Sequence, residues 1–461
     1  MSAPAPRRDG AELKAFLARL HFYVGLFVGP FLLVAALTGL LYVATPQLEE
    51  ALYRPVLRSD SQGAPQSLEA QYQAARVAAG PEARFFALRP APAPGQTTRV
   101  MFLTPGLGES ESHAYFIDPV TLAVLGDHIV YGTSGVLPLR TGIDYLHRNL
   151  MLGEPGRLYS ELAASWLWIA ALGGVLLWFW RDTGALARRA PGNRRLRTRR
   201  LHGLVGVGVA LGLLFLSATG LTWSRWAGER IDLLRGALGW VTPSVTLALQ
   251  PSAMPATGHG DHAHHGAAPP PATAAAEDPG PRLDAVLAAA RAAGIDSGFV
   301  EIRPPRPGRA WMVREYDRSW PTQVDTLALE PATLQVTSRA DFASFPLVAK
   351  LIRWGIDLHM GVLFGVANQV LVGLVALGLI GSGFYGYRIW WQNRPPAGAL
   401  PRTLAQAWLR LGLAARLAVL AVALALGWAL PVAGASLGLF LLVDGLRWRR
   451  ARRVARPVPA E

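Results

Sequence analysis

The sequence predicts an all-α polytopic membrane protein with a four-helix core, a C-terminal helix hairpin and two small α+β modules outside the bilayer. Hydrophobic residues make up 51% of the 461 positions, the formal charge is +14, and long apolar runs recur along the chain. Each run approaches the roughly 20 residues that a helix needs to cross a bilayer core of about 30 Å. An ordinary soluble domain does not combine these properties.

Cysteine is absent. Its absence excludes disulfides, iron–sulfur clusters, thiolate-ligated haem and covalent haem attachment through Cys-x-x-Cys-His, so any redox centre must use histidine or methionine. The basic residues are almost all arginine, and they cluster at the ends of the apolar runs as topology signals do. We therefore expect no nucleic-acid partner.

The arginine-rich segments set the expected topology, because short basic loops stay on the cytoplasmic side of the membrane. Both chain ends are therefore placed in the cytoplasm, with the protein in the inner membrane of a bacterial cell. The expected order is a cytoplasmic N-terminus 1–19, a first span 20–45, an outer module 46–145, a second span 146–181, a cytoplasmic loop 182–200, a third span 201–224, a second outer module 225–355, a fourth span 356–391, a hairpin of two spans 404–447 and a cytoplasmic tail 448–461. The hairpin would turn near Pro431. The alternative is that this region forms a single long span.

The two outer regions repeat one order of elements. The first has an expected helix at 67–79 and short alternating strands at 84–89, 98–103, 113–118 and 122–125. The second has an expected helix at 281–293 and strands at 299–303, 310–315 and 323–328. Each region therefore predicts a small α+β module. Segment 251–280, which is rich in Ala, Pro, Gly and His, is expected to be a disordered linker.

An internal repeat places a histidine at the start of two spans. Arg19-Leu20-His21 and Arg200-Leu201-His202 are each followed by a glycine four residues after the histidine and a Thr-Gly pair beginning seventeen residues after it. A second repeat, Gly-Ile-Asp, precedes His147 and His359 at the even spans. On the expected topology, His21 and His202 lie at the cytoplasmic edge, and the second two histidines lie at the outer edge.

Paired histidines on different helices suit b-type haem, because two neutral imidazoles can hold one iron from both sides. The four histidines therefore predict two haems b per chain, one held by His21 and His202 and one by His147 and His359. Glycine on the same helical face as a histidine leaves room for a flat macrocycle or for a close helix. The alternative is that each histidine is an interfacial residue that hydrogen-bonds to backbone or lipid headgroups.

Three segments resemble the PepSY-associated transmembrane-helix family, iron-regulated inner-membrane proteins that include di-haem ferric-siderophore reductases. They are Arg19-Leu20-His21, the run from His147 to Arg157 (His-Arg-Asn-Leu-Met-Leu-Gly-Glu-Pro-Gly-Arg), and the Phe-Ile-Asp-Pro turn ending at Pro119. The resemblance covers roughly residues 10–395. The second half departs from the pattern, since His359 is followed by Met-Gly-Val-Leu-Phe-Gly.

The resemblance implies a four-helix core that holds two haems b through His21, His147, His202 and His359, with PepSY-like modules in the periplasm. It also implies an oxidoreductase that reduces a ferric siderophore or other Fe(III) chelate and releases Fe(II). The electron donor, a quinol or a cytoplasmic flavin- or nicotinamide-linked molecule, must be separate, because the chain has no convincing Rossmann-type glycine fingerprint. No catalytic residue is assigned.

Other sites and functions stay open. Arg148 and Arg353 are candidate partners of haem propionates or simple interfacial anchors. A histidine-rich run suggests a transient metal site, or equally a tract without function. Its histidines are His259, His262, His264 and His265. Rival functions are a haem-free membrane anchor that binds or regulates a periplasmic partner or peptidase, and a copper or iron transporter, although the spans offer few carboxylates for an ion path.

Overall fold

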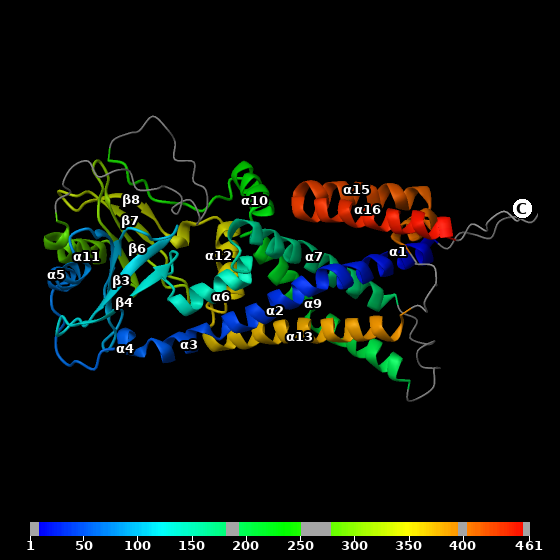
Figure 1. Ribbon diagram of the computed structural model, residues 1–461. Helices are drawn as coiled ribbons and strands as arrows, with labels where there is room; N and C mark the ends of the chain where they lie inside the picture. The colour runs from blue at the N-terminus through cyan, green and yellow to red at the C-terminus, as the bar shows by residue number, and fades with distance from the viewer. Residues whose placement is uncertain (1–8, 181–192, 250–277, 395–402, 455–461) are drawn as a thin grey trace, which may run out of the picture. The chain divides into compact units, whose positions relative to one another are not determined.

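The computed structural model describes residues 9–180, 193–249, 278–394 and 403–454, and these residues are mostly helical (Figure 1). The chain divides into two compact units. The first, here called the helical unit, comprises Met1–Leu41, Tyr145–Leu233 and Val370–Glu461. The second, the sheet unit, comprises Tyr42–Asp144 and Leu234–Gln369. The chain therefore passes back and forth between the two units.

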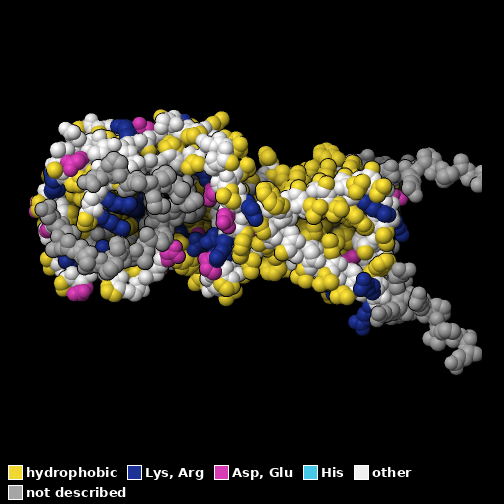
Figure 2. Space-filling view, turned by 90° about the horizontal axis from the view of Figure 1, so that it is seen from above, with side chains coloured by type: hydrophobic (Ala, Val, Ile, Leu, Met, Phe, Trp, Pro, Cys, Tyr) yellow, Lys and Arg dark blue, Asp and Glu magenta, His cyan; other side chains and the backbone are white. Residues whose placement is uncertain are grey.

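Four helical segments in the described ranges are long and apolar enough to cross a membrane, as expected. They are Gly10–Val43, which contains α1 (Asp9–Tyr23), the π-helical η1 (Val24–Val28) and α2 (Gly29–Val43), followed by α7 (Gly153–Phe179), α9 (Arg194–Leu221) and α13 (Gly365–Gln392). Figure 2 shows hydrophobic side chains over much of the visible surface of the helical unit. An apolar outer surface on helices of this length fits a lipid environment, where each helix satisfies its own backbone hydrogen bonds.

Small residues bring the spans close together. Methyl groups of Val375 on α13 approach Gly212 on α9, and Val209 on α9 in turn approaches Gly378 on α13. A side chain at either glycine would collide with the facing helix, so the two glycines allow the close contact that van der Waals packing between spans requires. Beside them, Val24, Val28 and Trp166 form a buried apolar core.

The C-terminal region forms two helices that lie side by side, the apolar α15 (Leu413–Ala429) and α16 (Pro431–Val454), which ends in arginines, after the short α14 (Leu404–Arg410). The chain turns at Leu430 and Pro431, where the sequence placed a hairpin. α15 has 17 residues and falls short of the length of the four spans. Whether this hairpin crosses the bilayer stays a prediction. Asp444 ties it to α14, because its carboxylate accepts the backbone N–H of Leu404 and Ala405 at 3.1 and 2.8 Å.

The sheet unit holds one antiparallel sheet of eight strands in the order β4-β3-β2-β1-β5-β6-β7-β8. The strands are β1 (Arg84–Arg89), β2 (Thr98–Leu103), β3 (Glu111–Ile117), β4 (Val124–Tyr131), β5 (Val300–Arg303), β6 (Trp311–Glu315), β7 (Thr326–Leu329) and β8 (Val336–Ala340). Two helices, α5 (Leu68–Ala79) and α11 (Leu283–Ala292), share one hydrophobic core with the sheet. The Ser67 side chain caps α5 by accepting the Ala70 N–H at 3.2 Å.

The expectation of two separate α+β modules was wrong, since β1 of the first pairs with β5 of the second through Leu88 and Ile302. Each set of four strands would leave an edge strand with unpaired backbone groups, and joining the two edges satisfies them. β8, which the sequence analysis missed, reads Val-Thr-Ser-Arg-Ala and is largely exposed, so it lacks a strong apolar alternation.

Two short amphipathic helices precede the even spans, which begin later than expected. α6 (Pro138–Asn149) ends just after His147, and α12 (Leu347–His359) ends at His359. Left-handed backbone at Met151, Gly153, Gly361 and Gly365 separates these helices from α7 and α13. His147 and His359 therefore lie in the last turns of separate helices rather than at the start of the spans. The remaining short helices are α3 (Thr45–Leu52), α4 (Arg54–Leu57), α10 (Trp226–Ala237), η2 (Gly280–Arg282) and η3 (Phe342–Ser344).

Candidate functional site

The imidazole rings of His21 and His202 lie together in the helical unit. Their centroids are 6.1 Å apart, and their planes meet at 66°. His21 is in the last turn of α1, directly before the π-helical segment η1, a kind of irregularity that is frequent at functional sites. Because an imidazole nitrogen binds a transition metal at about 2 Å, two rings on opposite sides of one metal have centroids about 6 Å apart. The observed separation matches that distance, and it also lies within the range of an edge-to-face contact between two rings.

A hydrogen bond fixes which nitrogen of His202 is available. Its Nδ1 lies 3.0 Å from the carbonyl oxygen of Ser382 on α13. A carbonyl oxygen only accepts, so Nδ1 carries the proton, and in the neutral ring Nε2 keeps a free lone pair. Metal-ligating histidines commonly use this arrangement, in which the second nitrogen donates to a backbone carbonyl and sets the ring orientation.

His147 is oriented by a different contact. Its Nδ1 lies 2.9 Å from Oγ1 of Thr38 on α2, and that hydroxyl lies 2.8 Å from the Val34 carbonyl. With its proton on the Val34 carbonyl, the hydroxyl accepts from Nδ1–H of the imidazole. Thr219, the counterpart of Thr38 in the repeat, donates to the Phe215 carbonyl at 2.8 Å in the same way. The repeated threonine thus has a structural role that its spacing from the histidine did not reveal.

Glycines lie against the histidine rings. A Cβ at Gly174 would lie 3.2 Å from Cε1 of His21, one at Gly386 would lie 3.5 Å from Cε1 of His202, and one at Gly39 would lie 3.3 Å from Cε1 of His147. Larger side chains at these three positions would press on the rings. The glycines therefore keep space open beside each of the three histidines.

Buried polar atoms without well-aligned hydrogen bonds gather near the first pair. They are Nδ1 of His21 and Oγ of Ser382, although the Ala170 carbonyl lies close enough to His21 to interact with its ring. Such atoms are rare in folded proteins and call for an explanation such as an additional group. Imidazole donors, glycine spaces and these polar atoms together fit a haem b between His21 and His202.

His359 and Arg353 belong to the sheet unit, where α12 ends. Arg353 Nε lies 3.2 Å from the carboxylate of Asp357, which is fully buried and also accepts from Arg318 Nε at 2.5 Å. Asn368 donates to the Leu358 carbonyl at 2.8 Å and so holds the end of α12. Arg353 is thus already paired with a carboxylate within its own helix.

Arg148, the other arginine candidate, lies in the helical unit. Its guanidinium is 5.4 Å from the centre of the Tyr145 ring. The histidines of the linker, His259, His262, His264 and His265, lie outside the described residues, as does most of segment 251–280. Within the described ranges, no three His, Asp or Glu side chains gather in a way that could hold a metal ion.

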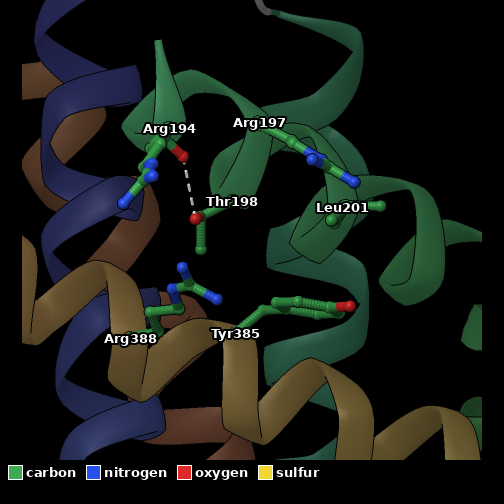
Figure 3. Close-up of a pocket in the computed structure, with 6 residues that line it drawn as sticks. All are labelled: Arg194, Arg197, Thr198, Leu201, Tyr385 and Arg388. Carbon is green, nitrogen blue, oxygen red and sulfur yellow. Dashed lines mark hydrogen bonds between the residues drawn. The ribbon is translucent and has the colours of Figure 1, made fainter. Parts of the chain in front are cut away.

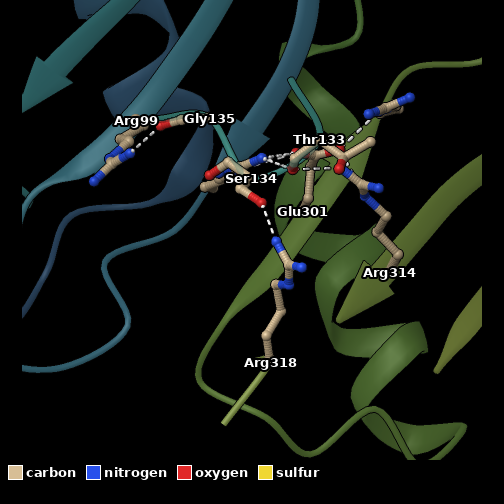
Figure 4. Close-up of polar contacts among 9 residues, drawn as sticks. Arg99, Thr133, Ser134, Gly135, Glu301, Arg314 and Arg318 are labelled. Atoms are coloured by element: carbon tan, nitrogen blue, oxygen red, sulfur yellow. Dashed lines mark hydrogen bonds and ion pairs between the residues drawn. The ribbon is translucent and has the colours of Figure 1, made fainter. Parts of the chain in front are cut away.

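A cluster of arginines in the sheet unit escaped the sequence analysis (Figure 4). We call it the arginine cluster; its members are Arg89, Arg99, Arg303, Arg314 and Arg318, and they surround Glu301 and the loop 133–135. Glu301 accepts from Arg89 at 2.8 Å, from Arg303 at 2.7 Å and from Arg314 at 2.9 Å. The signal for it was the presence of charged residues inside predicted strands at 299–303 and 310–315.

Positive charge exceeds negative charge in the arginine cluster. Burial is the main reason that the pKa of Arg314 is lowered to about 10, and Glu301 only partly offsets it. Burial alone would raise the pKa of Glu301, but Arg303, Arg314 and Arg89 hold it well below its usual range. Glu301, together with Asp357 beside Arg318, supplies two carboxylates for the five guanidiniums of the cluster. The cluster is therefore suited to attract an anion, which guanidinium groups bind through paired hydrogen bonds.

Comparison with known proteins identifies the family to which the chain belongs. No curated protein matches the chain. The pattern that describes the PepSY-associated transmembrane region matches residues 18–393, which is well over half of the chain. The matched range contains His21, His147, His202 and His359 together with the eight-stranded sheet. The chain therefore belongs to the PepSY-associated transmembrane family.

Proposed function

We propose that the chain is a di-haem b-type cytochrome of the bacterial inner membrane that reduces a ferric siderophore or other Fe(III) chelate in the periplasm and releases Fe(II). The observation that supports it most is the pair His21 and His202, whose ring centroids lie 6.1 Å apart. The hydrogen bond from Nδ1 of His202 to the Ser382 carbonyl adds to it, because it presents Nε2 of that ring as the nitrogen that would bind iron.

The histidines would act as two pairs, with His21 and His202 holding one haem b and His147 and His359 holding the other. When bound, haem b supplies reversible one-electron exchange, and two imidazole ligands leave no position for substrate at the iron. The Ser382 carbonyl orients His202, and the Thr38 hydroxyl orients His147.

The surroundings of the first pair favour electron transfer over other chemistry. Val24, Val28 and Leu213 are buried in the adjoining core and exclude water. A water-poor, rigid setting lowers the reorganisation that accompanies a change of charge. Each Fe(III) chelate needs one electron, which a separate quinol or a cytoplasmic flavin- or nicotinamide-linked donor would supply.

The arginine cluster supports the choice of substrate class. Guanidinium groups recognise carboxylates and other oxyanions with paired hydrogen bonds, and many Fe(III) chelates carry such groups. Arg303, Arg314 and Arg318 keep between 14% and 19% of their side-chain surface exposed, so the cluster reaches the surface of the sheet unit. We assign the cluster as the place where the anionic chelate is attracted to the sheet unit.

The first test is spectroscopic. The full chain in detergent should give a reduced-minus-oxidised b-type spectrum and two haems per chain by the pyridine-haemochrome method. His21→Ala and His202→Ala should each remove the same single haem, while His147→Ala and His359→Ala should remove the other. Reduced protein should then release Fe(II) from a ferric chelate, detected with a ferrous-specific chromophore.

A colourless protein after expression with added haem would overturn the proposal. It would leave a haem-free membrane anchor whose sheet unit binds or regulates a periplasmic partner or peptidase. Loss of both haems in every histidine variant would overturn the assignment of the two pairs, and a matched control at a half-buried histidine of the sheet unit, His128→Ala, should keep both haems.

A further inference from the structure

A pocket of about 320 Å³ lies between the ends of α9 and α13 in the helical unit (Figure 3). It is lined by Arg194, Arg197, Thr198, Leu201, Tyr385 and Arg388. Figure 3 shows the Arg388 guanidinium directed from α13 toward Thr198 on α9. None of the four histidines assigned to haem lines it. The pocket is therefore a second feature of the helical unit that the proposed electron transfer does not use.

The pocket presents positive charge alone. Its lining includes Arg194, Arg197 and Arg388, whose guanidiniums lie on different sides of it in Figure 3, and no Asp or Glu is among the described residues that line it. The Thr198 hydroxyl donates to the Arg194 carbonyl at 3.0 Å and is buried, so it contributes no free donor. The Tyr385 hydroxyl and the arginines are thus the groups that an anion would meet. Guanidiniums bind phosphate with paired, charge-assisted hydrogen bonds.

From the pocket toward its C-terminal end, α9 carries an apolar stripe. Arg197, Leu201, Leu204, Gly208 and Leu211 follow one another at spacings of three and four residues, which places them on one helical face. Leu204 is 47% exposed and Leu211 is 81% exposed. A side chain at Gly208 would meet nothing within 4 Å, so the stripe is open at its centre. It extends about 20 Å from Arg197 to Leu211, more than the depth of one bilayer leaflet.

α13 presents the same pattern beside it. Arg388, Phe384, Gly381, Leu377 and Leu374 alternate at spacings of four and three residues along one face. Leu374 is 58% exposed, Leu377 is 51% exposed and Phe384 is 61% exposed. α9 and α13 pack closely through Gly212 and Gly378. Two apolar stripes therefore run side by side from a basic pocket into the apolar zone of the spans.

We propose that this pocket is a specific site for an anionic phospholipid. The headgroup phosphate lies among Arg194, Arg197 and Arg388, and the acyl chains lie along the stripes of α9 and α13. Charge complementarity selects a lipid with net negative charge, and the apolar stripes select a diacyl lipid over a soluble anion. Basic pockets between spans on the cytoplasmic side bind such headgroups in other membrane proteins, and tyrosine is enriched at this depth.

The test uses the full chain, delipidated in detergent, and three probes: phosphatidylglycerol, phosphatidylcholine and inorganic phosphate. Bound lipid is counted by native mass spectrometry, and thermal stability is recorded at each probe concentration. We expect one phosphatidylglycerol to bind at least tenfold more tightly than phosphatidylcholine and to raise the melting temperature. Phosphate at the same concentration should do neither.

Three variants separate a specific site from general attraction between charges. Arg197→Gln with Arg388→Gln should weaken phosphatidylglycerol binding at least tenfold, whereas the matched control Arg195→Gln with Arg200→Gln, which removes two exposed charges of the same helix, should change it less than twofold. Gly208→Phe fills the stripe without altering charge and should also weaken binding.

Equal loss in the control pair would overturn the proposal in favour of nonspecific surface attraction. Equal effects of phosphate and phosphatidylglycerol would overturn it in favour of a soluble anion. Haem content measured on the same samples should not change in any variant, so the outcome is independent of the proposed electron transfer.

Discussion

Nδ1 of His147 lies 2.9 Å from the hydroxyl of Thr38, which itself donates to the backbone of its own helix. With its proton on the Val34 carbonyl, the threonine accepts from the imidazole and holds the ring in its orientation. The contact joins two parts of the repeat: the Thr-Gly pair of the first span and the histidine that precedes the second span.

Thr38→Val should weaken retention of one of the two proposed haems by about 10- to 100-fold, the range expected when a partner behind a metal ligand is removed. Valine has nearly the same shape as threonine but cannot accept the Nδ1 proton. Thr38→Ser restores the acceptor and should restore haem content. Haem per chain and midpoint potentials measure the effect; two haems with unchanged potentials in Thr38→Val would show that the hydroxyl does not support a ligand.

Gly174→Val should reduce haem binding at the His21 and His202 pair. A Cβ there would already lie 3.2 Å from the His21 ring, and the branched side chain would push the ring out of place. Gly438→Val is the control, because a Cβ at that helical glycine meets nothing within 4 Å. The pyridine-haemochrome assay should show one haem in the first variant and two in the second. Equal haem content in both would argue against a cofactor beside Gly174.

Glu301→Gln should destabilise the centre of the sheet by about 3–5 kcal/mol, the usual effect of removing one partner from a buried ion pair. Glu301 is fully buried and accepts from Arg89, Arg303 and Arg314. Glu50→Gln removes an exposed pair with Arg58 instead and should cost less than about 1 kcal/mol. Hydrogen exchange of peptides from β5 and β6 measures both; unchanged protection in Glu301→Gln would contradict the prediction.

Asp118 should make the sheet unit sensitive to acid. Burial alone would raise the pKa of Asp118, but hydrogen bonds from Ser61, Ser59 and the backbone N–H groups of Val120 and Thr121 hold it well below its usual range. A lowered folded-state pKa means that its stabilisation is complete above the unfolded value of about 3.9 and is lost as the pH falls below that value.

Wild-type protein should therefore lose melting temperature faster between about pH 4 and pH 3 than Asp118→Asn, which has no proton to take up at that position. Melting curves of both proteins over that range make the comparison. Parallel curves would show that the carboxylate does not titrate with unfolding.

The absence of cysteine allows a direct test of topology. Single cysteines can be introduced at Thr333, exposed between β7 and β8, and at Arg195, exposed at the start of α9. On the proposed orientation, a membrane-impermeant maleimide should label Thr333→Cys in spheroplasts and should reach Arg195→Cys only after the membrane is opened. The reverse pattern would invert the orientation.

Local elements could be predicted well from the sequence because their signals are local. α5 starts directly after its serine cap, and the strands at 84–89 and 98–103 coincide with β1 and β2. The breaks after His147 and His359 were missed, because left-handed backbone at Met151 and Gly361 has no strong signature in a run of mixed residues. The pairing of β1 with β5 was also missed, since it joins strands about 210 residues apart in the chain.

The candidate functional residues show the same difference between local and long-range signals. The repeat indicated His21 and His202 as a pair, and their rings lie together, while the haem they would hold stays a prediction. The arginine cluster could not be foreseen, because Arg89 and Arg314 meet Glu301 only after the two halves of the sheet have joined. A site made by long-range strand pairing leaves no compact motif.

The joined sheet has a consequence for how the protein is made. β1 is synthesised long before β5, and at about 5–20 residues per second the intervening chain takes roughly 10–40 s to emerge. Throughout that time the edge at Arg84–Arg89 is open to pairing with other chains. A newborn first half thus has an open strand edge until β5 arrives, and mutations that slow synthesis of the second half should increase aggregation even when they leave every folded contact intact.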